Sequence, residues 1–253
     1  MSIDHLYKYG QLTEHSEALF SSPQIWFSPP EQFNDPFECR PWFTFEGDEN
    51  QIVESLARFL RKRNHLMTKE TATAEAAAIF LEGRHRNPRT WEALRTDVVR
   101  MLGGEIGLYC LSRAPDSILM WSHYGHEHQG YCLEFEATDH TVVFGEAQPV
   151  LYSDDYPVVD FFNTPKEKQV DLIFLTKYIG WAYEQEWRIV DFQKGPGLRE
   201  YPPELLKRVI FGLRTSDRDR ALIREWVARR GHEVRFAEAG LDDRKFSIEI
   251  QAI

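Results

Sequence analysis

The sequence predicts an α+β protein with a mixed or antiparallel β-sheet core, flanking helices and a helical insertion. Strand-like segments recur along most of the chain, whereas helical spacing dominates from about residue 50 to residue 103. Only two further helical segments interrupt the later strand candidates, and several connections are short. This pattern suits a mixed or antiparallel sheet better than a doubly wound parallel one. We therefore expect one domain over residues 1–253, with the helical block inserted at about 50–103.

The N-terminal region is expected to consist of short extended pieces joined by turns. LYKY and IWFS are the strand candidates, and FNDPFE is the turn, because Asn and Asp bond to nearby backbone and Pro fixes φ. In the helical block, apolar residues from Ile52 to Leu60 recur at helical spacing, and the alanine-rich run 72–82 favours a second helix. A third helix is expected to begin with Thr90 as N-cap and to stop at Gly103-Gly104.

Most of the strand candidates lie beyond the helical block. Helices are expected at 165–182 and 217–230, and no Gly-rich phosphate-binding loop follows any strand candidate. The strand candidates are EIGLYCLS (105–112), YCLEFEA (131–137), PVLYS (149–153), EWRIVDF (186–192), RVIFG (208–212), EVRFAEA (233–239) and KFSIEIQ (245–251).

Composition excludes several classes of protein. With 42% hydrophobic and 28% charged residues, the chain is a folded globular protein rather than a disordered one. The net charge of −10 argues against a surface that grips nucleic acid as a whole. Two basic stretches, 58–65 and 84–89, leave a local basic patch open, although a solvated helix face and a loop are the favoured interpretation. Cys39, Cys110 and Cys132 are odd in number and far apart, which predicts free thiols rather than disulfides or a zinc site.

The N-terminus lacks the basic start and apolar stretch of a secretion signal. No window holds eighteen uncharged apolar residues, as a membrane-spanning helix requires. We therefore expect a cytoplasmic protein without a membrane partner.

The first candidate site segment is Leu6–Gly10. In an extended strand Tyr7 and Tyr9 share one face and Lys8 takes the other. A lysine among tyrosines suits a phosphate or carboxylate ligand; the alternative is an edge strand with a solvated lysine.

The second segment, IWFSPPEQFNDPFE, places Asn34 and Asp35 in a polar turn surrounded by aromatic residues. They are candidate ligand contacts. The alternative is an ordered surface turn held down by its phenylalanines.

The third segment, MWSHYG, brings a flat ring and three hydrogen-bonding groups close together at Trp121, Ser122, His123 and Tyr124. His123 is also the first member of a His-x-x-His-x-His run, but this spacing is not specific and metal sites need supporting carboxylates. We expect no metal. His126 and His128 are expected to be solvated, and His123 is the histidine with a candidate role.

The fourth segment contains Glu184, Glu186 and Arg188, whose alternation projects all three side chains from one face of a strand. Such charges are costly to bury unless they pair with each other or with a ligand. Trp187 and Ile189 are expected to face the core on the opposite side. A salt-bridged, exposed strand face is the alternative, but the neighbouring aromatic residues favour a partly buried site.

Taken together, LYKY, IWFS-x-P-x-x-FNDPFE, LMWSHYG with a following G-x-C-x-x-F, and K-x-x-x-W-x-Y-E-x-E-W-R resemble a bacterial family known as domain of unknown function 2971. The resemblance spans Leu6 to about Gly212. The family pattern is remotely similar to the ADP-ribosyltransferase fold, a split, mixed β-sheet with helices that cradles NAD in a groove. A late-strand Glu-x-Glu is a variant of that fold in which the second glutamate is catalytic. The sequence departs from the fold's pattern in having Tyr7 and Lys8 in place of a clear His or Arg, and in lacking a Ser-Thr-Ser motif.

The resemblance implies that NAD is the substrate and that the nicotinamide N-glycosidic bond is cleaved. Such chemistry requires stabilisation of an oxocarbenium-like ribose, as in glycoside cleavage. Glu186 would be the catalytic carboxylate, with Glu184 beside it. Tyr7, Tyr9, Asn34, Asp35, Trp121, Ser122 and Tyr124 would line the nucleotide site, and Lys8 or Arg188 would hold the diphosphate.

A toxin or phage-defence effector would suit this activity. Its acceptor stays open among protein, nucleic acid, small molecule and water. Two alternatives also stay open. One is a non-catalytic sensor of a small nucleotide. The other is a hydrolase of nucleotides or nucleic acid with His123 as general base and Glu184 or Glu186 as acid.

Overall fold

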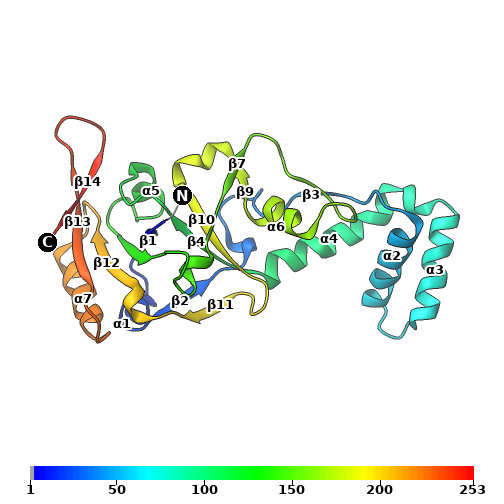
Figure 1. The fold of residues 1–253 in the computed structure, drawn as a ribbon, viewed down its shortest axis with the longest axis horizontal. Coiled ribbons are helices and arrows are strands. Elements are labelled where there is room, and N and C mark those ends of the chain that lie inside the picture. Colours follow the sequence, from blue (N-terminus) through cyan, green and yellow to red (C-terminus); the bar gives the residue numbers. More distant parts are fainter. Residues whose placement is uncertain (1–2) are drawn as a thin grey trace.

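The computed structural model describes residues 3–253, and its centre is a mixed β-sheet (Figure 1). Within these residues the sheet has eight strands in the order β14-β13-β12-β5-β1-β4-β10-β6. All neighbours are antiparallel except β12 and β13, which are parallel. The α+β class with a mixed sheet is thus confirmed. The strands are β1 (His5–Gly10), β4 (Gly107–Ser112), β5 (Tyr131–Glu136), β6 (Gln148–Pro149), β10 (Glu186–Asp191), β12 (Leu206–Phe211), β13 (Arg235–Leu241) and β14 (Ile248–Ala252).

Both faces of the sheet are covered. On one face the strands pack against α1 (Ser16–Ser21) and α7 (Asp217–Ala228) through a first hydrophobic core that contains Phe20, Tyr109 and Ile223. On the other face, near β1, β5 and β12, α5 (Ile118–His123) contributes Trp121 to a smaller core with Tyr9. The alternation of side chains along each strand therefore separates two environments.

Among residues 3–253, three short two-stranded sheets lie beside the main one. β2 (Gln24–Phe27) pairs with β11 (Gly197–Glu200) in antiparallel orientation. β3 (Trp42–Thr44) pairs with β8 (Val158–Asp160), and β7 (Leu151–Ser153) pairs with β9 (Thr176–Tyr178), both in parallel orientation.

The helix expected at 165–182 is wrong in its second half. Helix α6 (Lys166–Phe174) ends where the backbone turns into β9, which hydrogen-bonds to β7. A 3-10 helix at Ile179–Glu184 follows. The tertiary pairing of β9 thus overrides a local pattern that continued the helix.

The helical block forms an extension at one end of the molecule (Figure 1). Its helices are α2 (Glu49–Arg63), α3 (Lys69–Leu81) and α4 (Pro88–Glu105). They share a second hydrophobic core with β3, β8 and α6, in which the ring of Trp91 stacks on that of Phe45 at 4.7 Å between centroids. The extension is therefore packed onto the sheet-bearing body through continuous apolar contacts.

The expected limits of the third helix were wrong. Asn87, not Thr90, is the N-cap, because its side chain accepts a hydrogen bond from Arg89 N at 3.0 Å and Pro88 occupies the first helical position. The helix also continues through Gly103 and Gly104 to Glu105.

The main sheet opens between β1 and β4. These strands share a single residue pair, Tyr7 with Ser112, whereas β1–β5 and β4–β10 share six pairs each. The ammonium of Lys8 enters the opening and donates to the carbonyl oxygen of Cys110 at 2.8 Å. Lys8 thus supplies a hydrogen-bond donor to a carbonyl of β4 that lies too far from the backbone of β1 to pair with it.

Among residues 3–253, no helix is both long enough and apolar enough to span a membrane. The three cysteines are free; Cys39 and Cys132 are buried, and Cys110 is half-buried.

Candidate active site

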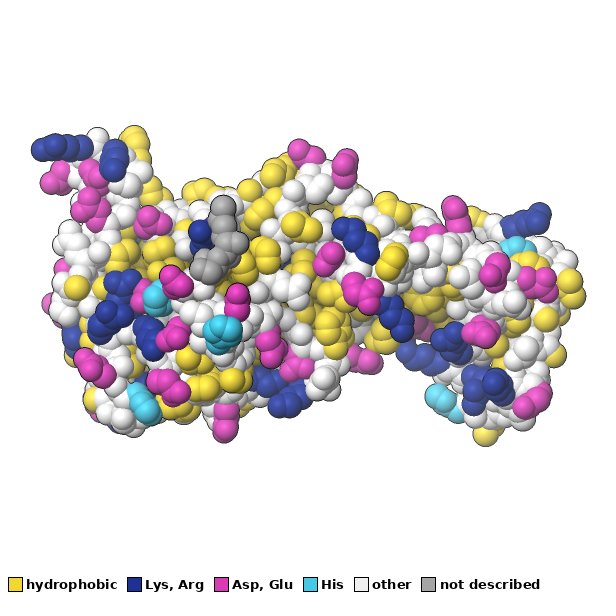
Figure 2. Space-filling model, viewed as in Figure 1, with side chains coloured by type: hydrophobic (Ala, Val, Ile, Leu, Met, Phe, Trp, Pro, Cys, Tyr) yellow, Lys and Arg dark blue, Asp and Glu magenta, His cyan; other side chains and the backbone are white. Residues whose placement is uncertain are grey.

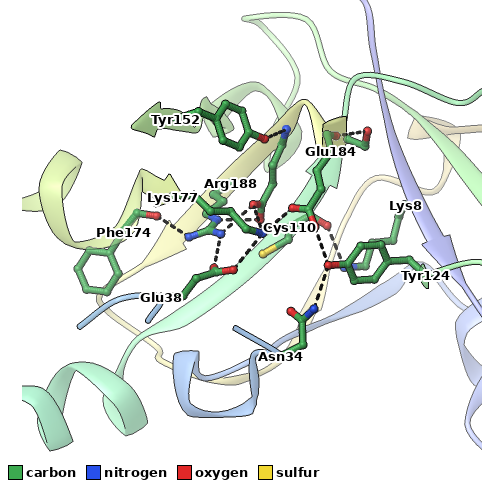
Figure 3. A network of polar contacts seen from close by, with 12 residues as sticks. Lys8, Asn34, Glu38, Cys110, Tyr124, Tyr152, Phe174, Lys177, Glu184 and Arg188 are labelled. Atoms are coloured by element: carbon green, nitrogen blue, oxygen red, sulfur yellow. Dashed lines mark hydrogen bonds and ion pairs between the residues drawn. The ribbon is translucent and has the colours of Figure 1, made fainter. Parts of the chain in front are cut away.

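A buried cluster of five charged side chains lies beside the opening of the sheet (Figure 3). We call it the ionic cluster; its members are Glu38, Lys177, Glu184, Glu186 and Arg188. Lys177 is at its centre. Its Nζ lies 2.9 Å from Glu38 Oε1, 2.5 Å from Glu184 Oε2 and 3.1 Å from Glu186 Oε2. One ammonium therefore gathers three carboxylates that are far apart in sequence.

Arg188 fixes Glu186 from the other side. Its Nε donates to Glu186 Oε1 at 2.7 Å and its Nη2 donates to Glu186 Oε2 at 2.8 Å, which is the bidentate geometry that suits a carboxylate. Nη1 donates to the carbonyl of Phe174 at 2.9 Å, and Nη2 also pairs with Glu38. Arg188 is fully buried, so its donors serve the protein rather than solvent.

The backbone brings Glu184 and Glu186 together by an unexpected route. Only Glu186 and Arg188 belong to β10; Glu184 ends the preceding 3-10 helix, and Gln185 between them has φ +45°. The side chains still converge because both carboxylates reach Lys177. Ile189, on the opposite face of β10, is buried in the first core, and Trp187 packs against it, as the alternation predicts.

The ionic cluster holds three carboxylates and two cations, so it carries one uncompensated negative charge when all five groups are ionised. Burial by itself raises the pKa of Glu186, but Arg188 and Lys177 outweigh it and lower the pKa to about 2. For Glu184 burial dominates and raises the pKa above its usual value, although Lys177 opposes this. The two neighbouring carboxyl groups are thus driven in opposite directions, an arrangement typical of acid–base sites.

Glu184 is also held by a tyrosine. Tyr124 Oη donates to Glu184 Oε1 at 2.6 Å and accepts from Asn34 Nδ2 at 3.2 Å. Burial and the neighbouring carboxylate raise the pKa of Tyr124, so its hydroxyl stays protonated and remains a donor. Tyr124 follows α5, whose start is capped by the side chain of Ser117. The capped helix therefore positions the Tyr124 hydroxyl against Glu184.

Three strands contribute residues at one level of the sheet. Tyr7 on β1 pairs with Ser112 on β4, and Ser112 pairs with Glu186 on β10. Ser112 Oγ donates to the carbonyl of Glu184 at 2.6 Å, and the amide of Glu186 donates to Tyr152 Oη at 2.8 Å. The backbone on both sides of Gln185 is therefore held in place by side chains.

Two adjoining cavities reach the ionic cluster. The smaller, of about 290 Å³, lies at the opening between β1 and β4. The larger, of about 700 Å³, has mainly apolar walls that include Phe37, Tyr156 and Trp181. Asn34, Glu38 and Lys177 line both cavities and mark their boundary. Each volume is within or close to the range of small-molecule sites, roughly 300–1,000 Å³.

Most of the residues expected from sequence meet at the smaller cavity. Those that line it are Tyr7, Lys8, Tyr9, Asn34, Tyr124, Glu184 and Glu186. Asp35 lines the larger cavity, where its Oδ1 accepts a hydrogen bond from Phe37 N at 2.9 Å within the turn. The structure thus joins four segments that are separated by up to about 180 positions of sequence.

Four expected residues line neither cavity. Trp121 is fully buried in the core beneath α5, where its Nε1 donates to Pro115 O at 2.9 Å. Ser122 and His123 are exposed. Arg188 is fully buried, and its guanidinium donors are engaged by Glu186, Glu38 and the carbonyl of Phe174. Trp121 packs edge-to-face on Tyr9, which lines the smaller cavity, and so supports the cavity wall without lining it.

The sequence did not predict three of the site residues, namely Lys177, Glu38 and Ser112. Lys177 is the first residue of the motif K-x-x-x-W-x-Y-E-x-E-W-R, and a lysine among apolar and aromatic residues is a signal that could have found it. Glu38 follows the Asn34-Asp35 turn, where nothing in the local pattern distinguishes it from a solvated acid. Ser112 ends a strand, and its role depends on pairing with β1 and β10.

Within residues 3–253, no group of three or more His, Cys, Asp or Glu side chains is arranged so that it could hold a metal ion. The three carboxylates of the ionic cluster instead pair with Lys177 and Arg188, which offset two of their three charges.

Fold and site together define an α+β protein with a buried carboxylate cluster beneath a pair of cavities. A family model described as protein of unknown function (DUF2971) matches residues 120–189. This match supports the family resemblance expected from the motifs over this part of the chain, and the matched segment contains Tyr124, Lys177, Glu184, Glu186 and Arg188. No curated protein and no solved structure matches the chain.

Proposed function

We propose that the chain cleaves the N-glycosidic bond between nicotinamide and ribose in NAD, as an ADP-ribosyltransferase-like enzyme. The observation that carries the proposal is the uncompensated carboxylate at the cavity, with Glu184 poised between Lys177 and Tyr124. A site with one excess negative charge and aromatic walls is complementary to a cationic nicotinamide ring and to the oxocarbenium ion that replaces it.

Glu184, rather than Glu186, is the carboxylate that we assign to the reacting centre. Both oxygens of Glu186 are engaged by Arg188, and one of them also pairs with Lys177, so its charge is already compensated; the same two cations lower its pKa. Glu184 has the raised pKa, and its partner Tyr124 also lines the cavity. In this assignment Glu186 and Arg188 are positioning residues that hold Lys177 and thereby Glu184.

The reaction balances without a metal or redox cofactor. The bond between ribose C1′ and the nicotinamide nitrogen breaks, and its electron pair leaves with nicotinamide, which becomes neutral. The nucleophile then attacks C1′; with water as nucleophile the products are ADP-ribose, nicotinamide and one proton. Glu184 would accept that proton, because its raised pKa makes it a better base than an ordinary exposed carboxylate.

The cavities support a ligand of nucleotide size. The smaller one, at the carboxylates, would hold nicotinamide and its ribose, with Tyr7, Tyr9 and Tyr124 as walls. The larger one would hold the adenosine part against Phe37, Tyr156 and Trp181. Lys177 Nζ lies 5.0 Å from the centroid of the Trp181 ring at the boundary. Lys8, which lines the smaller cavity, is the remaining candidate for the diphosphate.

The test is nicotinamide release from NAD by the purified protein, measured by chromatography with and without cell lysate as acceptor. Glu184→Gln should reduce release by roughly 10²–10³-fold, and Tyr124→Phe by roughly 10–100-fold through loss of a hydrogen bond to a charged group. Tyr201→Phe is the matched control, since Tyr201 is a buried tyrosine that bonds Arg230 in the first core, away from both cavities. Release that Glu184→Gln leaves unchanged would refute the assignment.

A non-catalytic nucleotide sensor is the second candidate, favoured by the complete pairing of Glu186 and Glu38 within the ionic cluster. Calorimetric titration with NAD separates the two. Binding that survives Glu184→Gln, with no release by either form, supports the sensor. If the protein neither binds NAD nor releases nicotinamide from it, NAD is ruled out as the ligand in both proposals.

A further inference from the structure

The helical extension carries a charge opposite to that of the rest of the protein. Residues 49–105 contain ten Lys and Arg against eight Asp and Glu, a formal charge of +2, although the whole chain carries −10. In Figure 2, Lys and Arg side chains gather on the lower face of the extension. A polyanion that approaches this protein is therefore repelled by the body and attracted by the extension.

A groove between α2 and α4 concentrates this positive charge. It has a volume of about 560 Å³ and includes Lys62 and Arg63 from the end of α2 together with Arg89 and Arg100 from α4. Among residues 3–253, Lys62, Arg63 and Arg89 form no ion pair with a carboxylate, and all three are exposed. The groove thus offers three cations that no protein group neutralises.

The acidic residues in the groove do not cancel its charge. Asp97 pairs with Arg100 at 2.6 Å, and Glu92 is the other carboxylate in the lining. Four basic against two acidic side chains leave a net charge of +2 in the groove. Their spacing over the ends of two helices suits a ligand with repeated negative charges rather than one small anion.

We propose that this groove, which we call the basic groove, binds the phosphodiester backbone of a nucleic acid. Two observations favour phosphates over bases as the groups recognised. Three unpaired cations provide contacts to phosphate oxygens, whereas no aromatic residue lines the groove to stack on a base. Binding is therefore electrostatic and independent of sequence. This inference concerns a surface separate from the cavities and does not depend on NAD chemistry.

The test is fluorescence anisotropy of the full chain with labelled single-stranded RNA and with duplex DNA, each of about 20 nucleotides or base pairs. For the single strand, the logarithm of the association constant should fall with the logarithm of salt concentration with a slope of roughly −2, as expected for three phosphate contacts. The triple variant Lys62→Glu, Arg63→Glu, Arg89→Glu should bind at least roughly 10-fold more weakly at low salt, with a shallower slope.

The matched control is the triple variant Arg218→Glu, Arg235→Glu, Arg244→Glu. These arginines are exposed, make no ion pair within residues 3–253 and lie outside the extension, so the change in total charge is identical. Equal weakening by both triple variants would show that only net charge matters and would overturn the proposal. No binding of either nucleic acid by the unmodified chain would also overturn it.

Circular dichroism shows whether the reversed charges unfold the helices. If they do, the neutral variant Lys62→Gln, Arg63→Gln, Arg89→Gln replaces the charge reversal, with the corresponding three Gln substitutions at 218, 235 and 244 as control. A neutral variant that keeps full affinity would again contradict the assignment. The two probes also distinguish a single-strand preference from a duplex preference.

Discussion

Replacing Glu186 by glutamine tests whether the ionic cluster stabilises the fold. The carboxylate has its pKa lowered from 4.5 to about 2, a difference of about 2.5 units. At about 1.4 kcal/mol per pKa unit this corresponds to roughly 3–4 kcal/mol of stability at pH 7. Removal of one partner from a buried ion pair typically costs a similar amount, roughly 3–5 kcal/mol. Glu186→Gln should therefore lower the free energy of unfolding by about 3 kcal/mol.

The assay is urea unfolding at neutral pH, followed by tryptophan fluorescence, together with a thermal scan. For a chain of this length, about 3 kcal/mol corresponds to a decrease in Tm of roughly 6–12 °C. Glu54→Gln is the control, because Glu54 and Arg58 form an exposed pair one helical turn apart, and its loss should change stability by roughly 0.5 kcal/mol or less.

The pH dependence provides a second measure of the same interaction. A carboxyl group with a lowered folded-state pKa stabilises the fold above about pH 4.5, and that contribution is lost as the pH falls towards 2. Glu184 acts in the opposite sense. Because its folded-state pKa is raised, its ionised form destabilises the folded state at high pH, and this destabilisation disappears when the pH falls and the carboxyl group is protonated. Glu186→Gln should therefore flatten the loss of stability between about pH 4.5 and 2. A variant as stable as the original chain at pH 7, with the same acid profile, would refute the reasoning.

Three further predictions follow from the packing. Trp91→Ala should destabilise the protein by roughly 3–5 kcal/mol, since it removes a buried ring stacked on Phe45 in the second core; a cost under about 1 kcal/mol in urea unfolding would show that the extension is not anchored there. Ser117→Ala should cost roughly 0.5–2 kcal/mol through loss of the α5 N-cap, measured by the same unfolding assay, and should also weaken NAD turnover if α5 positions Tyr124. Thiol labelling at pH 8 should be slow in the folded protein and fast in urea, because burial raises the pKa of Cys39 to about 12 and raises that of Cys110 and Cys132 well above the usual value; rapid labelling of the native chain would contradict this.

Much of the fold could be predicted from sequence because local patterns report local structure. The periodicity at 50–63 and in the alanine-rich run corresponds to α2 and α3, and the strand candidates at 131–137 and 186–192 correspond closely to β5 and β10. The errors lie where tertiary contacts decide. Thr176–Tyr178 became a strand because β7 was available to pair with it.

The candidate site was predicted only as separate segments. The types and spacing of Glu184, Glu186 and Tyr124 marked them as candidates, since charged and aromatic side chains at close spacing are unusual outside sites. No local pattern could show that Trp121 faces away from the cavity, because a short helix turns its neighbours to different sides.

The sequence by itself determined the class of fold, the family resemblance, and the segments in which the polar and aromatic groups of the site lie. Tertiary structure alone decided that Lys177 and Glu38 lie beside Glu184 and Glu186 and that Arg188 is buried next to them. It also decided that α2 and α4 place their cations around one groove. The reason is that secondary structure depends on neighbouring residues, whereas pairing and burial of charges depend on which distant segments meet.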